Sequence, residues 1–207
     1  LYDGTQVIGE LFWQSHAHHT QELAPSIAEL MAHSGKKMEA GQALGVALGP
    51  GSFTSLRVGL ALAKGLALAR HLPLIGIPTL DILAAAQPGR NLALAAVIQA
   101  GRGRLAVGWY KALKNGWQSL GPATVMTVEQ LSRRIRQRTL VCGELTADER
   151  ARLARKYKNV ILASPAQCVR RPAVLAELAW QKWSSGKEDP TASLAPVYLH
   201  VAGGLPA

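Results

Sequence analysis

Apolar residues along the chain follow strand and helix spacings in alternation, with glycine, proline or polar stretches between them. Short apolar runs bounded by such breaks indicate buried strands, and apolar residues that recur every three or four positions indicate helices packed on a core. In the first half, the pattern predicts a hairpin at residues 1–13, helices at 20–33, 54–70 and 79–86, and strands at 44–48 and 72–77.

The second half continues the alternation of strands and helices. The pattern predicts strands at residues 92–98, 104–110, 140–143 and 159–163, and helices that begin near residues 127, 146 and 172. Thr127 with Gln130, and Thr146 with Glu149, have the spacing of capping boxes, in which two side chains satisfy each other's helix-end amides. These two positions therefore predict helix starts.

A break at Gln87-Pro88-Gly89-Arg90 predicts a boundary between two subdomains. We expect an N-terminal subdomain over residues 1–88 and a reduced C-terminal subdomain over 89–207 that ends in an extended segment. The two halves look loosely parallel, since each begins with a hairpin followed by a strand and a helix. The predicted fold class is α/β with mixed sheets.

The stretch at residues 48–59 combines the end of a strand, a glycine turn and the start of a helix. Two glycines flank Pro50, and a serine or a threonine can cap the helix that follows. Such a turn aims backbone N–H groups and the positive end of the helix dipole at one point, which suits a phosphate. It lacks the Lys-Ser/Thr of a Walker loop, so a phosphate site and a plain capped turn both stay open. The residues of such a site would be Gly49, Gly51, Ser52 and Thr54.

The helix predicted at residues 54–70 is apolar nearly all round. Only Arg57, Lys64 and Arg70 interrupt it. A helix without a polar side is either sandwiched in a core or covered by another subunit, and both interpretations stay open here.

Three segments of this region, at residues 49–54, 56–59 and 63–67, resemble the signature of the TsaB (YeaZ) family. Their sequences are GPGSFT, LRVG and AKGLA. Ser55 departs from the signature, which usually has glycine there, and Gln99 stands where the family commonly has aspartate. The resemblance covers most of the chain. It implies the actin, Hsp70 and sugar-kinase type of fold, made of two ribonuclease-H-like halves of which the second is reduced.

The resemblance also implies a function. It implies a non-catalytic subunit, without metal or cofactor, that pairs with the TsaD enzyme in threonylcarbamoyladenosine modification of tRNA. A TsaE ATPase is a further implied partner, and the chain is expected to form a homodimer when alone. The two helices at residues 19–33 and 54–70 would form the contact. We expect these side chains in it: Leu23, Ile27, Leu56, Leu60, Ala63 and Ala67, flanked by Arg57 and Lys64.

Two other functions stay open. An enzyme of the sugar-kinase type could use residues 49–54 as its phosphate loop, although phosphotransfer needs metal-binding carboxylates and the first half has few acids. A tRNA-binding module is the other, because the formal net charge of +10 favours a polyanion or gives a solvated basic surface. We interpret the lysines and arginines of the basic stretches at 133–138 and 150–158 as not interleaved with aromatic residues, so single-strand stacking is not indicated.

The remaining candidate chemistry points away from metals and membranes. His16, His18 and His19 lie in a predicted loop at a spacing that does not match the helical zinc motif, so we interpret them as a polar loop. Cys142 and Cys168 form no cluster, which fits a reducing cytoplasm. No apolar run is long enough to predict a membrane span. The chain opens at what reads as the end of a strand, so we expect the first strand of the fold to precede residue 1.

Overall fold

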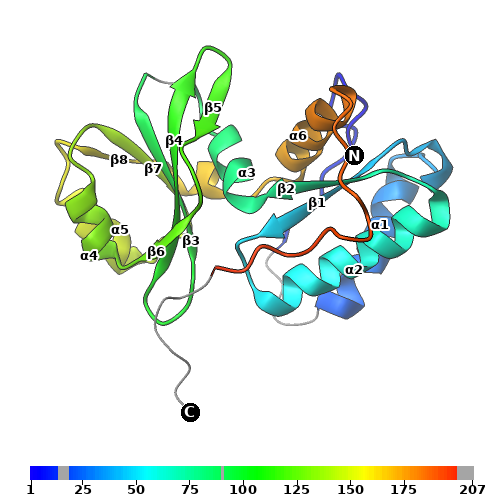
Figure 1. Ribbon diagram of the computed structural model, residues 1–207, viewed down its shortest axis with the longest axis horizontal. Helices are drawn as coiled ribbons and strands as arrows, with labels where there is room; N and C mark the ends of the chain where they lie inside the picture. Colours follow the sequence, from blue (N-terminus) through cyan, green and yellow to red (C-terminus); the bar gives the residue numbers. More distant parts are fainter. Residues whose placement is uncertain (14–18, 90, 200–207) are drawn as a thin grey trace. The chain divides into compact units, whose positions relative to one another are not determined.

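The computed structural model describes residues 1–13, 19–89 and 91–199 (Figure 1). Its contacts divide the chain into two compact units, one of Leu1–Pro78 with Arg171–Pro196 and one of Thr79–Arg170 with Val197–Ala207. The boundary predicted between residues 88 and 89 is therefore not the one that the contacts define. Leu80 and Leu83 explain the difference. Both are buried in the core of the second unit, so the helix that contains them belongs to that unit. No described helix is long and apolar enough to cross a membrane.

The first unit contains a two-stranded parallel sheet with helices on both faces. Its elements are α1 (His19–His33), η1 (Met38–Ala40), β1 (Leu44–Gly49), α2 (Phe53–Arg70), β2 (Leu74–Pro78) and α6 (Pro172–Ser184). In Figure 1, α1 and α2 lie on one side of β1 and β2, and α6 lies on the other. The helices and strands predicted for the first half are confirmed within one or two residues at most of their ends.

Side chains alternate between the two faces of this sheet. Val46 and Leu74 are buried against α2, where they form the core of the first unit with residues of that helix. Gly45 points to the other face, where a Cβ atom would lie 2.8 Å from the Cβ of Ala179 on α6. Glycine at this position therefore allows α6 to pack closely on the sheet.

The N-terminal segment is tied to α6 by one carboxylate. Glu10 Oε1 accepts a hydrogen bond of 2.9 Å from the backbone N–H of Ala173, and Oε2 accepts two from Arg171. Arg171, the N-cap residue of α6, has no side-chain cap of its own, so Glu10 supplies it from a distant part of the chain. The hairpin predicted at residues 1–13 contributes only a single bridge between Tyr2 and Val7.

The second unit is a mixed sheet with helices on both faces. Its elements are α3 (Thr79–Ala85), β3 (Ala93–Gln99), β4 (Leu105–Leu113), β5 (Gly116–Ser119), β6 (Thr124–Met126), α4 (Val128–Arg134), β7 (Thr139–Gly143), α5 (Ala147–Ala154), β8 (Val160–Leu162) and η2 (Pro165–Cys168). The strand order is β5-β4-β3-β7-β8, and β6 also pairs with β4. β7 runs parallel to both β3 and β8, whereas β4 runs antiparallel to β3. The α/β class with a mixed sheet is confirmed.

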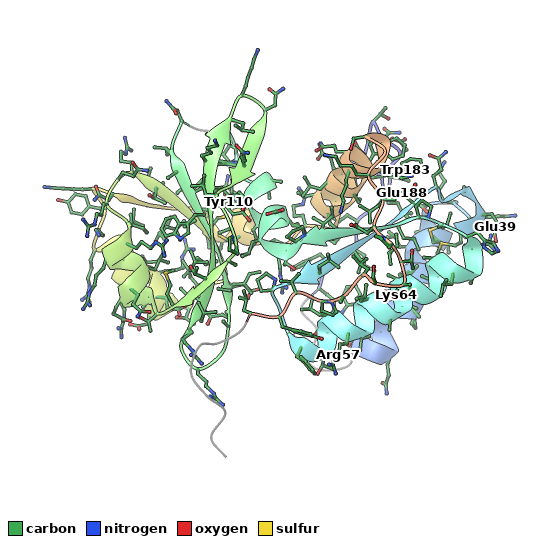
Figure 2. The ribbon with its side chains drawn as sticks, in the orientation of Figure 1. Glu39, Arg57, Lys64, Tyr110, Trp183 and Glu188 are labelled. Atoms are coloured by element: carbon green, nitrogen blue, oxygen red, sulfur yellow. The ribbon has the colours of Figure 1, made fainter. Side chains whose placement is uncertain are left out.

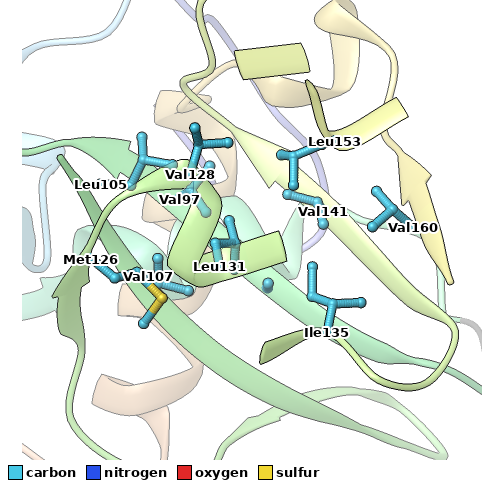
Figure 3. Close-up of a cluster of buried hydrophobic side chains, with 11 residues drawn as sticks. Val97, Leu105, Val107, Met126, Val128, Leu131, Ile135, Val141, Leu153 and Val160 are labelled. Atoms are coloured by element: carbon cyan, nitrogen blue, oxygen red, sulfur yellow. The ribbon is translucent and has the colours of Figure 1, made fainter. Parts of the chain in front are cut away.

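Two apolar clusters, one on each face, form the core of the second unit. α4 and α5 cover one face, where Leu131 and Leu153 are fully buried beside residues of β3, β4, β7 and β8 (Figure 3). α3 covers the other face. Both predicted capping boxes are present, since the side chains of Thr127 and Thr146 each accept a hydrogen bond from the third helical residue. The helix starts predicted from those two spacings are confirmed.

Candidate subunit interface and glycine turn

The glycine turn leads from β1 into α2 as the sequence predicted. Gly49 has a φ of +106°, which favours glycine, and a cis peptide bond joins it to Pro50. Ser52 is the N-cap, and its Oγ accepts a hydrogen bond of 3.5 Å from the backbone N–H of Ser55. Of the two possible caps, Ser52 therefore begins the helix. Ser55 lies inside the first helical turn, where serine in place of the family's glycine adopts helical angles without strain.

The same turn exposes part of the proposed phosphate site. Ser52 and Thr54 are exposed, Gly51 is half-buried and the first turn of α2 carries no acidic residue. The guanidinium of Arg57 stacks 3.8 Å from the centre of the Phe53 ring. Phosphate binding by this turn stays a prediction, because its geometry serves equally well as a capped strand-to-helix connection.

Two residues predicted to contact a partner lie inside the core instead. Leu60 and Ala67 are only 5% and 2% exposed, and both belong to the buried cluster of the first unit. Ala63 is half-buried and packs against the same cluster. The large apolar side of α2 thus faces β1 and β2, so Leu60 and Ala67 are unavailable for a contact with another subunit.

The opposite side of α2 is exposed and nearly uncharged. Ala61, Gly65 and Leu68 are exposed at helical spacing beyond Arg57, and Leu68 is 67% exposed. Phe53 extends this face at the start of the helix with 53% exposure. Sequence reasoning missed these residues because it followed the bulky ridges. A signal for this face was present in the sequence, since only one of the four residues at helical spacing 57, 61, 65 and 68 is charged.

A groove between α1 and α2 adjoins this region. It has a volume of about 460 Å³ and is walled mainly by apolar side chains, with Lys36 and Lys37 at its rim. Its remaining lining residues are Ala24, Ile27, Ala28, Met31, Met38, Glu39, Leu62 and Leu66. Ile27 and Leu23, both predicted at the contact, are half-buried on α1, and Leu56 is half-buried in the first turn of α2.

Polar side chains along α2 are engaged within the first unit. In Figure 2, Arg57, Lys64 and Glu39 mark the start, the middle and the end of the helix. Arg70 at the end pairs with Glu39 at 2.6 Å, and Lys64 Nζ donates a hydrogen bond of 3.0 Å to the carbonyl of Ala192. Lys64, predicted to flank a partner contact, therefore holds the segment that follows α6.

Asp189 anchors that same segment on β2. Its Oδ2 accepts hydrogen bonds from the backbone N–H of Gly76 at 2.8 Å and from Lys182 Nζ at 2.6 Å. Burial raises the pKa of Asp189, but the hydrogen bonds from Lys182 and Gly76 together lower it below the ordinary value. Leu194 of the segment packs against the core of the first unit, so the segment closes the α2 side of the sheet.

The acids of the second unit are engaged in structural hydrogen bonds. Gln99 Nε2 donates to Glu149 Oε2 at 2.7 Å and to the backbone carbonyl of Glu144 at 3.3 Å, and the Glu144 carboxylate accepts from the backbone N–H of Gln99 at 3.2 Å. A carboxylate side chain at residue 99 could not donate to the Glu149 carboxylate or to the Glu144 carbonyl. Asp81 accepts a hydrogen bond of 2.7 Å from Tyr110, and burial raises the pKa of Asp81.

No group of three potential metal ligands occurs among the described residues. The loop with His16 and His18 lies outside the described residues, as does the side chain of His19, so the interpretation of these histidines is untested. Cys142 is buried, and burial raises the pKa of its thiol to about 12, which keeps it protonated at neutral pH.

Comparison with known proteins defines the class of protein. The model of the family "TsaD: tRNA N6-adenosine threonylcarbamoyltransferase" matches residues 13–170. Solved structures share the fold. One of them, described as YeaZ from Pseudomonas aeruginosa, has a TM-score of 0.72 and 24% identity, over 89% of this chain and 87% of that one. The protein therefore has the fold of the actin, Hsp70 and sugar-kinase class.

Sequence relatives identify the family within that class. The TsaB protein of tRNA threonylcarbamoyladenosine biosynthesis from Escherichia coli is 34% identical over 58% of this chain and 53% of its own length. Its counterpart from Haemophilus influenzae is 41% identical over 42% of this chain and 36% of its own length. A tRNA N6-adenosine threonylcarbamoyltransferase from Solidesulfovibrio magneticus is 46% identical, but over 38% of this chain and only 22% of its own length. The chain belongs to the TsaB (YeaZ) family. It spans about half the length, or less, of the curated relatives it matches.

Proposed function

We propose that this chain is a binding subunit, without catalysis of its own, in the biosynthesis of threonylcarbamoyladenosine in tRNA. The exposed, nearly uncharged face of α2 carries the proposal. A helix of this length exposes so little charge when another surface covers it, because apolar surface in water is unfavourable. The TsaB relatives are named for this biosynthesis, which supports the assignment.

The proposed partner of the α2 face is a TsaD-type threonylcarbamoyltransferase. The family model and the relative from Solidesulfovibrio magneticus carry that enzyme's name. Because this chain and such an enzyme would share their fold, equivalent helices of the two proteins can pack against each other. A second copy of the chain would use the same face when the enzyme is absent. A TsaE-type ATPase is the proposed third component.

Exposure on α2 is the basis on which we propose the residues of the contact. In the proposed contact, the exposed residues of α2 form the centre, with Phe53 at one end and Leu68 at the other, and the groove beside α1 lies at the edge. Leu23, Ile27 and Leu56 stay in the proposal because they are partly exposed next to this face.

The test is co-purification of the full-length protein with a TsaD-type partner, read by mass on a sizing column. Ala61→Arg places a long charged side chain in the middle of the exposed face, so we expect complex formation to fall at least a hundredfold. Ala61 is a sharper position than Ala63, whose replacement would also disturb the core.

Ala151→Arg is the matched control, because Ala151 is an exposed alanine on a helix of the second unit. This variant is expected to pair normally. If Ala61→Arg pairs as well as the control, α2 is not the contact surface. If the unaltered protein forms no complex but hydrolyses ATP alone, the kinase-type alternative replaces the proposal.

A further inference from the structure

The C-terminal ends of α4 and α5 form one continuous surface of the second unit. α4 and the chain from residue 152 to 159 lie side by side, joined by hydrogen bonds at matched steps. These bonds join Glu129 to Arg152, Ser132 to Lys156, and Arg136 to Asn159. The first two use charged side chains, and in the third Asn159 Nδ2 donates to the Arg136 carbonyl at 3.1 Å. The seam between the two segments is therefore held in place by interactions along its whole length.

Cations gather at one end of this seam without carboxylates to balance them. Five exposed side chains define what we call the basic seam: Arg133, Arg136, Arg138, Arg155 and Lys158. Residues 130–143 and 150–176 contain no aspartate or glutamate. The acids at the opposite end, Glu129 and Asp148, both pair with Arg152. Acidic residues thus lie at the N-terminal ends of α4 and α5, and the cations of the basic seam lie at and beyond their C-terminal ends.

The basic seam does not stabilise the fold. None of its five side chains forms an ion pair or a hydrogen bond with another described residue, and like charges on one surface repel. The core beneath them is apolar and complete, with Leu131, Ile135 and Leu153 at most 1% exposed. These side chains are therefore hydrated and open to contact with an external anion.

An exposed aromatic ring accompanies these charges. Tyr157 lies between Lys156 and Lys158 and is 74% exposed, more than any other large apolar or aromatic side chain that the structure describes. The expectation from sequence that this stretch does not indicate stacking overlooked the ring, because the many cations dominate it. A ring that is open on its face offers a platform for an unpaired base.

We propose that the basic seam binds RNA, with the arginines on backbone phosphates and Tyr157 stacked on an unpaired base. The inference rests on the proposed function, which makes a structured tRNA the relevant polyanion. Arginine suits this role because its planar fork of donors matches the geometry of phosphate oxygens. A membrane surface fits less well, because α4 and α5 bury Val128, Leu131 and Leu153 and leave no apolar face to insert.

The test measures binding of an unmodified tRNA transcript to the full-length protein across a range of salt concentrations. We expect the triple variant Arg136→Gln/Arg138→Gln/Arg155→Gln to bind more than tenfold more weakly at low salt. Its slope of log affinity against log salt should be shallower by about two, since each lost phosphate contact removes about 0.7 to 0.9. Tyr157→Ala should weaken binding about fivefold or more without changing the slope, whereas Tyr157→Phe should retain affinity.

Lys111→Gln/Lys114→Gln/Lys187→Gln is the matched control, since it removes three exposed charges elsewhere. If control and seam variants bind tRNA alike, the inference is wrong. It is also overturned if anionic phospholipid vesicles or polyglutamate compete equally with tRNA at the seam, because the surface would then recognise negative charge alone. The seam variant should still co-purify with the TsaD-type partner, and Ala61→Arg should still bind tRNA, so a failure here is separable from a failure of the proposed pairing.

Discussion

The exposed side of helix α2 in the first unit is mostly uncharged, whereas the exposed sides of helices α4 and α5 in the second unit are rich in arginine. α2 exposes Ala61, Gly65 and Leu68, while α4 and α5 bury their large apolar residues and expose arginines. The stability of the isolated chain favours the second arrangement, in which apolar surface leaves water and charge stays hydrated. Each surface therefore points to a different binding role. The uncharged face suits a protein, and the cationic one suits a polyanion.

The comparison is tested most strongly by the same substitution on both helices. Leu131→Ala empties a fully buried position of α4 and should lower the free energy of unfolding by about 2 to 5 kcal/mol. Leu68→Ala, at a residue 67% exposed on α2, should change it by less than about 0.5 kcal/mol. Urea denaturation followed by circular dichroism gives both values.

Leu68→Ala should nevertheless weaken pairing with the TsaD-type partner, and Leu131→Ala should not do so at temperatures where it remains folded. A large loss of stability in Leu68→Ala would contradict the comparison, because it would mean that the exposed face of α2 already packs against the chain itself.

In the second unit, Gln99 donates hydrogen bonds to Glu144 and Glu149, and Gln99→Glu tests what these bonds contribute. The new carboxylate would face the Glu149 carboxylate and the backbone carbonyl oxygen of Glu144, in place of an amide that donates to both. We therefore expect the free energy of unfolding to fall by about 1 to 3 kcal/mol at pH 7. Repulsion raises the pKa of such a cluster, so the loss should shrink as the pH falls and the carboxylates take up protons. Urea denaturation at pH 7 and at pH 4.5 measures the difference.

Gln118→Glu is the control, because Gln118 is exposed on β5. Its effect should be small at both pH values. If Gln99→Glu is as well tolerated as this control, the hydrogen bonds of Gln99 contribute little, and the departure from the family's aspartate has no explanation in this network.

The sequence predicted the helices and most strands because each carries a local signal. Ser52, Thr127 and Thr146 cap helices by contacts within three or four residues, which sequence spacing reveals directly. The unit boundary and the burial of Leu60 depend instead on which sheet a helix packs against, and no local pattern records that choice. Glu10, which caps α6 across the chain, is likewise invisible to spacing.

The candidate sites were predicted in part for the same reason. The apolar character of α2 was evident in the sequence. Which of its residues are exposed depends on which side of the helix packs against the sheet, and the sequence does not show that. The basic seam was visible as charge, whereas the alignment of residues 152–159 with α4 depends on hydrogen bonds between distant residues. Tyr157 becomes a candidate for base stacking only once its exposure is known.

A smaller loss of stability than that of Gln99→Glu is expected at Asp189, which holds the segment after α6 on β2. Its folded-state pKa lies below the ordinary value, so its contribution is fully present above an unfolded pKa of about 3.9 and is lost as the pH falls through the folded value. Asp189→Asn should cost up to about 1 kcal/mol at pH 7, since the ion pair with Lys182 is partly exposed. Between pH 4 and pH 2, the unaltered protein should lose that advantage over the variant in urea denaturation.

Glu188→Gln, at the exposed neighbour labelled in Figure 2, is the control. Its difference from the unaltered protein in the free energy of unfolding should not change with pH. Identical acid profiles for Asp189→Asn and the unaltered protein would mean that Leu194 and Lys64 hold the segment without this carboxylate.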